Sequence, residues 1–489
     1  MAKSISVLLV TSEIYPFVKT SEIADLCYAH SLGSREVGTD FRAMMPKYGY
    51  ISERKNRIHE INRLRDIPIP VGVEEFPATV KSSSINNPRV KVQAYITTNT
   101  NFLDARKGIL ADNTTGSLFP DNDERYIFYN RTVLETCLLL GWFPDVIHCI
   151  GWQTALVPAY MRTMFTDAFK KTKIVMTIDD FAEQGVFSPK TLAKTNLPEP
   201  VRDIMKYKNK ANFLRAGIAH ADAVTTLSPG YAEELLALKE FKDNWLPLFK
   251  RKSLDGIAHG IDQLQWNPKN DAVLKSKYDA KDRSGKALCR EHLQKAVGLP
   301  VDASAIVASF VNQLSESEGA DALLAAVPEM VKEGVQVILR SDVPTDFTKD
   351  ALALQKKFPT VKVLIGSDEE MLHKIMAGST VLLKPARSCS HAQYVRVALA
   401  YGTIPVVRQT GGLSEGLTQA DAQGTGNAFI MKKADAADIV STLKSVKALQ
   451  SIHATWDQLV TNAMTSNVSW TLSSKPYDEL YRNLLKETK

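Results

Sequence analysis

The sequence contains few cysteines, and they lie far apart. Five occur, Cys27, Cys137, Cys149, Cys289 and Cys389, and no two of them form a C-x-x-C pair. An odd number of widely spaced cysteines argues against a disulfide framework and against a cysteine-ligated zinc site. We therefore expect reduced thiols, a cytoplasmic location, and neither a bound metal nor another cofactor.

Long hydrophobic runs and clusters of one charge are also absent. The first apolar run is only four or five residues long, too short for the core of a signal peptide. No stretch approaches the roughly 18 apolar residues of a membrane span. The net charge of +6 is spread over 489 residues, which gives weak support for nucleic-acid binding. We expect neither a membrane nor a nucleic acid as partner.

Short β-branched runs alternate with longer segments of helical pattern. Nine runs predict strands, at 7–10, 146–150, 174–178, 223–227, 306–311, 335–339, 361–365, 381–383 and 404–407. Segments between them, such as 319–334 and 368–379, repeat apolar residues every three or four positions, as amphipathic helices do. This alternation predicts an α/β fold whose parallel sheets carry helices on both faces.

Nine strands are too many for one sheet of comfortable size, so we expect two domains. The segment 252–271 is rich in Gly, Asn, Asp and Pro and marks the division. We predict two doubly wound, Rossmann-like domains, 1–255 and 256–465, that face each other across a cleft. The final segment, 466–489, is expected to form a helix that packs back onto the first domain, which the less regular region 66–125 decorates.

Several strand-to-helix junctions, where ligands bind in open parallel sheets, carry polar residues. Lys19 precedes a helix that begins near Ser21 or Glu22, so an ammonium group and free N–H groups meet there and favour an anion. A solvated loop lysine is the alternative. After the last predicted strand, Gly411 and Gly412 let bare backbone approach a phosphate or a sugar, although any tight turn explains two glycines.

The junction at 385–393 offers thiol, hydroxyl and imidazole groups but no carboxylate. Its sequence is PARSCSHAQ, which includes Cys389 and His391. A cysteine nucleophile is conceivable there, but packing of the loop is the favoured role. A hydrolase is a third interpretation, but it lacks a G-x-S-x-G elbow and a metal-ligand spacing.

Taken together, these segments resemble the bacterial glycogen synthases and plant starch synthases, the ADP-glucose-dependent glucosyltransferases. The resemblance runs nearly end to end and includes LLVTSEIYPFVKT (8–20), MPKYGY (45–50), DVIHCIGWQTALVPAY (145–160) and YGTIPVVRQTGGL (401–413). It implies the GT-B fold, with the donor held mainly by the C-terminal domain. It also implies transfer of glucose from ADP-glucose to the non-reducing end of an α-1,4-glucan with retention of configuration. The partners implied are ADP-glucose and α-glucan.

The chain departs from the family pattern in its N-terminal half. The family motif Lys-Thr-Gly-Gly keeps Lys19, but Ser21 and Glu22 replace the glycines that let backbone approach the donor. The histidine that contacts the donor sugar in the family falls on Ile150. The family segment Thr-Ile-His-Asn is TIDD (177–180) here.

The C-terminal half departs further. Gln313 and Glu318 stand where the family has the Arg and Lys that hold the donor diphosphate. The near-invariant glutamate of the catalytic region falls on Cys389, and the family cysteine falls on His391. The resemblance therefore leaves the catalytic residues unknown. Of the expected substrate-binding residues, Lys19, Thr410, Gly411 and Gly412 are kept.

These substitutions remove charge where the transition state needs it. Glucosyl transfer builds negative charge on the leaving diphosphate, and fixed positive groups stabilise it. Losing two charge-assisted hydrogen bonds would remove roughly 3–6 kcal/mol, and Glu318 adds a repelling charge. We therefore predict a family member with weak or lost catalysis and a glucan-binding or regulatory role beside a catalytic paralogue, that is, a pseudoenzyme.

The alternative is a fully active, retaining glucosyltransferase with a divergent site, in which Arg340, Lys384 or Arg387 supplies the missing charge. The loss of catalysis would be contradicted if guanidinium and ammonium groups from elsewhere converged beside the turn at 410–412.

Overall fold

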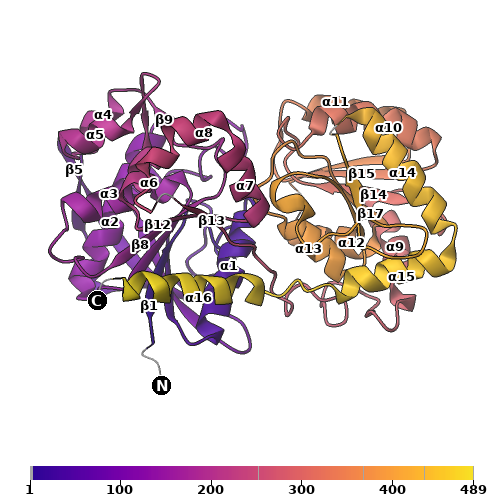
Figure 1. The fold of residues 1–489 in the computed structure, drawn as a ribbon, viewed down its shortest axis with the longest axis horizontal. Coiled ribbons are helices and arrows are strands. Elements are labelled where there is room, and N and C mark those ends of the chain that lie inside the picture. Colours follow the sequence, from indigo (N-terminus) through magenta and orange to yellow (C-terminus); the bar gives the residue numbers. More distant parts are fainter. Residues whose placement is uncertain (1–3, 252, 367, 434, 488–489) are drawn as a thin grey trace. The chain divides into compact units, whose positions relative to one another are not determined.

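The structure is a computed structural model that describes residues 4–487 except 252, 367 and 434 (Figure 1). The chain forms two compact units. Unit 1 comprises Met1–His259 and Trp470–Lys489, and unit 2 comprises Gly260–Ser469. The unit boundaries at 259 and 469 lie close to the expected domain boundaries at 255 and 465.

Unit 1 is built around a mixed sheet with a parallel centre. The strand order is β13-β12-β8-β7-β1-β2-β6-β5-β3, and β4 pairs with β5. The parallel strands are β13 (Leu254–Gly256), β12 (Ala223–Thr226), β8 (Lys173–Ile178), β7 (Val146–Ile150), β1 (Ser6–Val10), β2 (Asp40–Pro46) and β6 (Lys91–Thr98). Antiparallel strands β5 (Glu74–Asn86), β4 (Ile67–Val71) and β3 (His59–Glu60) complete one edge. Central strands such as β7 are buried throughout, which explains their continuous apolar sequences.

The region 66–125 is more regular than the sequence analysis expected. Strand β5 is 13 residues long, and β6 extends the main sheet by pairing with β2. The expectation of an irregular decoration was therefore wrong. Residues of β5 alternate between buried and half-buried from Ala78 to Lys81, because an antiparallel strand commonly has one solvated face. A search for continuous apolar runs misses such a strand.

Helices and a small second sheet complete unit 1. The helices are α1 (Glu22–Glu36), α2 (Asn122–Leu140), α3 (Leu156–Thr163), α4 (Thr191–Lys194), α5 (Glu199–Met205), α6 (Phe213–His220), α7 (Pro229–Ala237), α8 (Lys239–Asn244) and α16 (Thr471–Lys486). The small sheet contains β9 (Val186–Phe187), β10 (Lys206–Tyr207) and β11 (Lys210–Asn212).

The last helix, α16, is fastened to the core of unit 1 by a buried polar network. The hydroxyl of Tyr481 lies 3.1 Å from Nε2 of His30 and 2.7 Å from Nδ1 of His148. Nε2 of His148 in turn lies 2.6 Å from Oγ1 of Thr177 on β8. Burial lowers the pKa of His148 to about 3, so this imidazole is neutral. Both of its ring nitrogens have hydrogen-bond partners in the core.

Unit 2 is a smaller, wholly parallel domain. Its strand order is β16-β15-β14-β17-β18-β19, and the order reverses between β14 and β17, the switch point at which such sheets bind ligands. The strands are β14 (Val307–Val311), β15 (Gln336–Ser341), β16 (Val361–Ile365), β17 (Val381–Lys384), β18 (Ile404–Arg408) and β19 (Phe429–Met431). The helices are α9 (Ser284–Val297), α10 (Ala320–Lys332), α11 (Thr348–Lys357), α12 (Glu369–Gly378), α13 (Gln393–Ala400), α14 (Ala436–Gln450) and α15 (His453–Thr465).

All nine predicted strands are present, and the α/β class is confirmed. The five cysteines are free and buried. Within the described part of the chain, no helix combines the length and the apolar character needed to cross a membrane.

Candidate functional site

The loop after β1 is organised around a buried glutamate. Oε2 of Glu13 accepts hydrogen bonds from the backbone N–H groups of Thr20 (2.8 Å) and Ser21 (3.2 Å), and Oε1 accepts one from the hydroxyl of Ser21 (2.5 Å). Burial raises the pKa of Glu13, and these hydrogen bonds act in the opposite direction. Ser21 is also the N-cap of α1, accepting from the N–H of Ile23. A position that is glycine in the family pattern is therefore a structural cap here.

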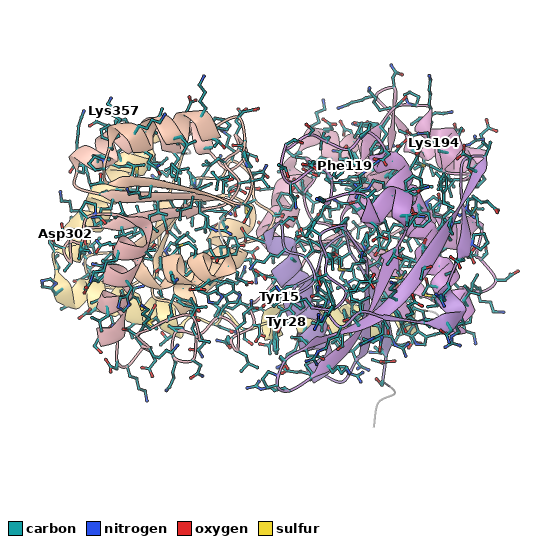
Figure 2. The ribbon with its side chains drawn as sticks, turned by 180° about the vertical axis from the view of Figure 1, so that it is seen from behind. Tyr15, Tyr28, Phe119, Lys194, Asp302 and Lys357 are labelled. Atoms are coloured by element: carbon teal, nitrogen blue, oxygen red, sulfur yellow. The ribbon has the colours of Figure 1, made fainter. Side chains whose placement is uncertain are left out.

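Lys19, in the same loop, forms an ion pair with a buried carboxylate of α1. Its Nζ lies 2.7 Å from Oδ2 of Asp25, whose side chain is 2% exposed. Glu22, in the first turn of α1, is buried as well. The ring of Tyr15 meets that of Tyr28 edge to face at 5.1 Å and holds the loop against α1 (Figure 2). The lysine expected to attract an anion thus lies among carboxylates and neutralises one of them.

The end of β7 has no hydrogen-bonding side chain at the position of the family histidine. Ile150 is 1% exposed and belongs to the core. Gly151 follows with φ 78° and ψ 163°, a conformation that is essentially restricted to glycine. A Cβ atom there would lie 2.6 Å from Oε1 of Gln153 and 2.9 Å from Oδ2 of Asp179. Carboxylate and amide oxygens therefore crowd this strand end.

Asp179 is the first residue after β8, and its surroundings favour the neutral form of its carboxyl group. Burial raises the pKa of Asp179 to about 7, and the charges of Asp180 and Glu183 raise it further. Trp152 packs in the aromatic core rather than standing free, since it contacts the rings of Tyr126 and Phe187. In the TIDD segment, burial thus pushes Asp179 towards its neutral form, whereas Asp180 is exposed.

In unit 2, the two altered phosphate-holding positions follow β14. Gln313 is exposed. Oε2 of Glu318 lies 3.3 Å from Nζ of Lys384, and the lysine side chain is 2% exposed. The lysine that could have replaced a family cation is therefore engaged by a buried ion pair.

Arg340, the second proposed replacement, is engaged in the same way. Its Nη2 lies 2.7 Å from Oδ1 of Asp342, and the arginine side chain is 5% exposed. Arg387 forms a bidentate pair with Asp321, at 2.7 and 2.6 Å. Each of the three cations considered as replacements is thus paired with a carboxylate.

The loop after β17 uses its thiol for packing. Sγ of Cys389 donates to the carbonyl of His391 at 2.7 Å, and the carbonyl of Cys389 accepts from the N–H of Gly412 at 2.9 Å. A small apolar cluster surrounds the thiol and comprises Ala386, Cys389, Ala392, Val395, Val407 and Leu413. Nδ1 of His391 lies 2.8 Å from the hydroxyl of Ser390. These contacts support the packing role of the thiol.

The retained turn at 410–412 lies against this loop. Gly411 has φ 42°, a left-handed value that favours glycine. The hydroxyl of Thr410 donates to the carbonyl of Arg387 at 3.5 Å, and Nη1 of Arg408 donates to the same oxygen at 2.6 Å. Strand β18 thus places an arginine and the Thr-Gly-Gly turn beside each other.

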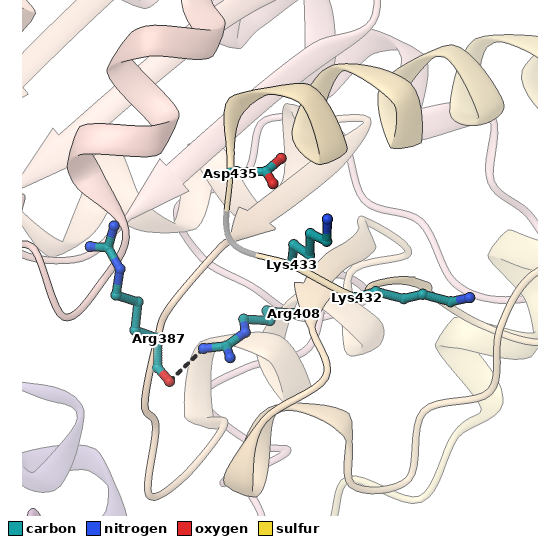
Figure 3. Close-up of a pocket in the computed structure, with 5 residues that line it drawn as sticks. All are labelled: Arg387, Arg408, Lys432, Lys433 and Asp435. Atoms are coloured by element: carbon teal, nitrogen blue, oxygen red, sulfur yellow. Dashed lines mark hydrogen bonds between the residues drawn. The ribbon is translucent and has the colours of Figure 1, made fainter.

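Sequence reasoning missed a cationic pocket at this edge. It has a volume of about 500 Å³ and is lined by Arg387, Arg408, Lys432, Lys433 and Asp435 (Figure 3). The lysines follow β19, a three-residue strand too short to stand out in the sequence. A pair of lysines directly after the apolar run AFIM (428–431) was the available signal. Cations gathered beside the turn at 410–412 would contradict the predicted loss of catalysis, and this pocket meets that condition in part.

Within the described residues, no group of three or more His, Cys, Asp or Glu side chains is arranged to hold a metal ion.

Comparison with known proteins decides the family. The family model for the starch synthase catalytic domain matches residues 6–248. The glycogen synthase of Chlorobium phaeobacteroides is 33% identical over 495 residues, covering 99% of each chain. The chain belongs to the glycogen synthase and starch synthase family. The glycogen synthase of Chlorobaculum tepidum is similarly related to this family member, at 32% identity over 490 residues and 99% of each chain.

Solved structures show the fold of this glycogen synthase family member. The catalytic domain of starch synthase IV from Arabidopsis thaliana, bound to ADP and acarbose, matches with a TM-score of 0.88 and 23% identity, covering 99% of this chain and 100% of that one. Sucrose-phosphate synthase from Thermosynechococcus elongatus matches with a TM-score of 0.60 and 13% identity, with the same coverage. The predicted family and the predicted GT-B fold are both confirmed.

Proposed function

We propose that this protein binds α-glucan in glycogen biosynthesis and transfers glucose from ADP-glucose weakly or not at all. The observation that carries the proposal is the pairing of the replacement cations: Lys384 with Glu318, Arg340 with Asp342, and Arg387 with Asp321. A cation held by a carboxylate is not available to a leaving diphosphate unless that pair is first broken. We place the protein in the cytoplasm with reduced thiols, in keeping with its five free, buried cysteines.

The side chains that would stabilise the reacting sugar are also replaced. An oxocarbenium-like sugar needs carboxylate or hydrogen-bonding groups beside it. Ile150 is apolar and buried, and the thiol of Cys389 already donates within its own loop. Each 1.4 kcal/mol of lost stabilisation slows the reaction about tenfold, so the combined losses predict a very slow transfer.

Binding of glucan does not depend on the altered phosphate positions, which is why we retain it in the proposal. The starch synthase IV structure was bound to acarbose as well as ADP. A glucan-binding protein without transfer would act beside a catalytic paralogue, as a regulatory or targeting partner.

One observation favours a second candidate, an active transferase with a divergent site. Arg408, Lys432 and Lys433 line one pocket, and Arg408 lies two residues before the retained turn at 410–412. If they reached a diphosphate, they would replace part of the lost charge.

Two measurements on the full-length protein separate the candidates. The first is incorporation of labelled glucose from ADP-glucose into glycogen, with the Chlorobium phaeobacteroides glycogen synthase as positive control. The second is co-sedimentation with glycogen. We expect co-sedimentation and little or no incorporation. Incorporation at a rate comparable with the control would overturn the proposal in favour of the active transferase, and failure to co-sediment would remove the glucan-binding role.

A further inference from the structure

A second pocket of unit 2 is formed by two helices that lie side by side, α9 and α12 (Figure 1). Together with the segment 273–275, these helices enclose a volume of about 290 Å³. None of the lining residues directly follows a strand. This α9–α12 pocket is therefore separate from the pocket at the carboxyl ends of β17, β18 and β19.

The helices that form the α9–α12 pocket are in close contact. A Cβ atom at Gly378 of α12 would lie 2.7 Å from Cβ of Leu293 and 2.8 Å from the carbonyl oxygen of Cys289, so a larger residue would push the helices apart. Near the start of α9, Nζ of Lys286 donates to the carbonyl oxygen of Ala377 on α12 at 3.1 Å. These contacts fix the walls of the pocket before a ligand binds, which lowers the cost of binding.

The inner surface of the pocket is apolar. Leu274 and Cys289, which are 6% and 4% exposed, line it together with Val273 and Ala296. A buried thiol behaves as a small apolar side chain, and Sγ of Cys289 already donates to the carbonyl oxygen of Ser276 at 3.2 Å. Burial raises the pKa of this thiol, so it is uncharged at neutral pH. The inner surface therefore favours an apolar ligand body.

Cationic side chains border this apolar surface. Lys275, Lys295 and Lys374 line the pocket, and no Asp or Glu is among the lining residues that the structure describes. Lys295 and Lys374 each pair with a glutamate one turn earlier on the same helix, but partly exposed pairs of this kind are weak. In the described part of the chain, no ion pair involves Lys275. The three ammonium groups thus favour a ligand with negative charge.

From the apolar surface and its cationic border we propose that the α9–α12 pocket binds a small organic acid with an apolar body and one carboxylate. The apolar body covers Leu274 and Cys289 while the carboxylate accepts charge-assisted hydrogen bonds from the lysines, which are strong. No arginine is among the described lining residues, so the bidentate recognition that favours phosphate is missing.

The size of the pocket also limits the ligand. About 290 Å³ is close to the lower limit of about 300 Å³ for small-molecule pockets, which suits one small molecule rather than a stretch of polymer. The proposal requires neither glucan binding nor glucosyl transfer, so each can fail without the other.

Calorimetric titration of the full-length protein with octanoate at low ionic strength tests the site. The variant Lys275→Gln/Lys374→Gln removes two of the three ammonium groups. Its matched control, Lys349→Gln/Lys356→Gln, removes the same charge from exposed positions on α11. We expect saturable binding that the test variant weakens by about tenfold, equal to about 1.4 kcal/mol, and that the control leaves within about twofold.

A second pair of variants tests the position of the ligand. Ala296→Phe places a large side chain in the pocket from an exposed position of α9, whereas Ala287→Phe places it on an exposed position of the same helix outside the pocket. Circular dichroism confirms that both variants fold. We expect Ala296→Phe to weaken octanoate binding by more than about tenfold and Ala287→Phe to leave it within about twofold.

Two further ligands separate the two parts of the proposed organic acid. Octanol keeps the apolar chain without the charge, and acetate keeps the carboxylate without the chain. We expect each to bind at least about tenfold more weakly than octanoate. The proposal is overturned if octanoate does not saturate, if octanol or acetate binds as tightly, if either test variant binds octanoate like wild type, or if a control variant weakens binding as much as its test variant.

Discussion

The carboxyl edges of the two sheets differ in charge although both units are wound from parallel strands. In unit 1 the edge carries the carboxylates of Glu13, Glu22, Asp25 and Asp179, of which Asp25 is paired with Lys19. In unit 2 the edge carries cations. Arg340 and Lys384 are paired with carboxylates, whereas within the described residues no ion pair involves Arg408, Lys432 or Lys433. A retained fold therefore does not preserve a site, because the loops decide whether a charge serves the protein's own stability or remains available to a ligand.

The largest expected effect comes from breaking the buried pair in unit 1. Lys19→Ala removes the counter-charge from Asp25, whose side chain is 2% exposed. We expect the free energy of unfolding to fall by about 3 kcal/mol, because the buried carboxylate of Asp25 loses the ammonium group that lies 2.7 Å away. Urea denaturation measures this. Lys349→Ala on α11 is the exposed control, expected within about 0.5 kcal/mol of wild type. Equal effects would show that Lys19 is an ordinary solvated lysine.

A backbone change at the same edge should have a somewhat smaller effect. Gly151→Ala forces a side chain into a conformation restricted to glycine and against Gln153 and Asp179. We expect a loss of about 2 kcal/mol in unfolding free energy. Gly38→Ala, where φ is 94° but no atom lies within 4 Å of the added Cβ, isolates backbone strain from crowding. If both variants lose the same amount, the crowding at Gly151 is unimportant.

The raised pKa of Asp179 predicts that the difference in stability between wild type and Asp179→Asn depends on pH. Because the folded pKa of about 7 lies above the ordinary value of 3.8, the folded state binds the proton more tightly than the unfolded state between those values. Wild-type stability should therefore fall as the pH rises from about 4 to 7. Asp179→Asn removes that loss, so between pH 4 and pH 8 the variant should gain stability relative to wild type, by about 1.4 kcal/mol for each unit of the pKa shift.

The measurement is thermal or urea unfolding at both pH values. Asp167→Asn serves as the matched control, because Asp167 is exposed and does not affect the pKa of Asp179. A difference between wild type and Asp179→Asn that stays constant with pH would contradict the raised pKa.

The smallest effect on stability is expected at an exposed pair in unit 2. Asp321→Asn breaks the ion pair with Arg387, but the two side chains are 43% and 37% exposed, so the free energy of unfolding should change by less than about 0.5 kcal/mol. Urea denaturation measures this change. A loss of more than about 1 kcal/mol would show that the pair stabilises the fold despite its exposure.

The sequence allowed the fold to be predicted where strands are buried on both faces. Strands β1, β7, β8 and β12 and the strands of unit 2 other than β19 are continuous apolar runs, as parallel strands are. Strands β5 and β6 were missed because they lie towards an edge with antiparallel pairing. The three-residue β19 was too short to recognise.

The candidate site was harder to predict, because the charges that remain available to a ligand depend on contacts between residues far apart in the sequence. Arg387 and Asp321 are 66 positions apart, and nothing local to Lys384 indicates that Glu318 will pair with it. The roles of Lys19, Thr410, Gly411 and Gly412 in binding substrate remain predictions. Alignment with the family motifs located the altered positions, but it could not show which charges the folded chain had already used.

The most direct test of the central claim is a comparison of ADP-glucose turnover between wild type and a variant with the family residues restored. The variant carries Ile150→His, Gln313→Arg, Glu318→Lys and Cys389→Glu, and circular dichroism confirms its folding. Since each pair of lost charged contacts is worth roughly 3–6 kcal/mol, we expect incorporation into glycogen to rise by at least about 100-fold over wild type. Wild-type incorporation that already matches the Chlorobium phaeobacteroides glycogen synthase would contradict the account.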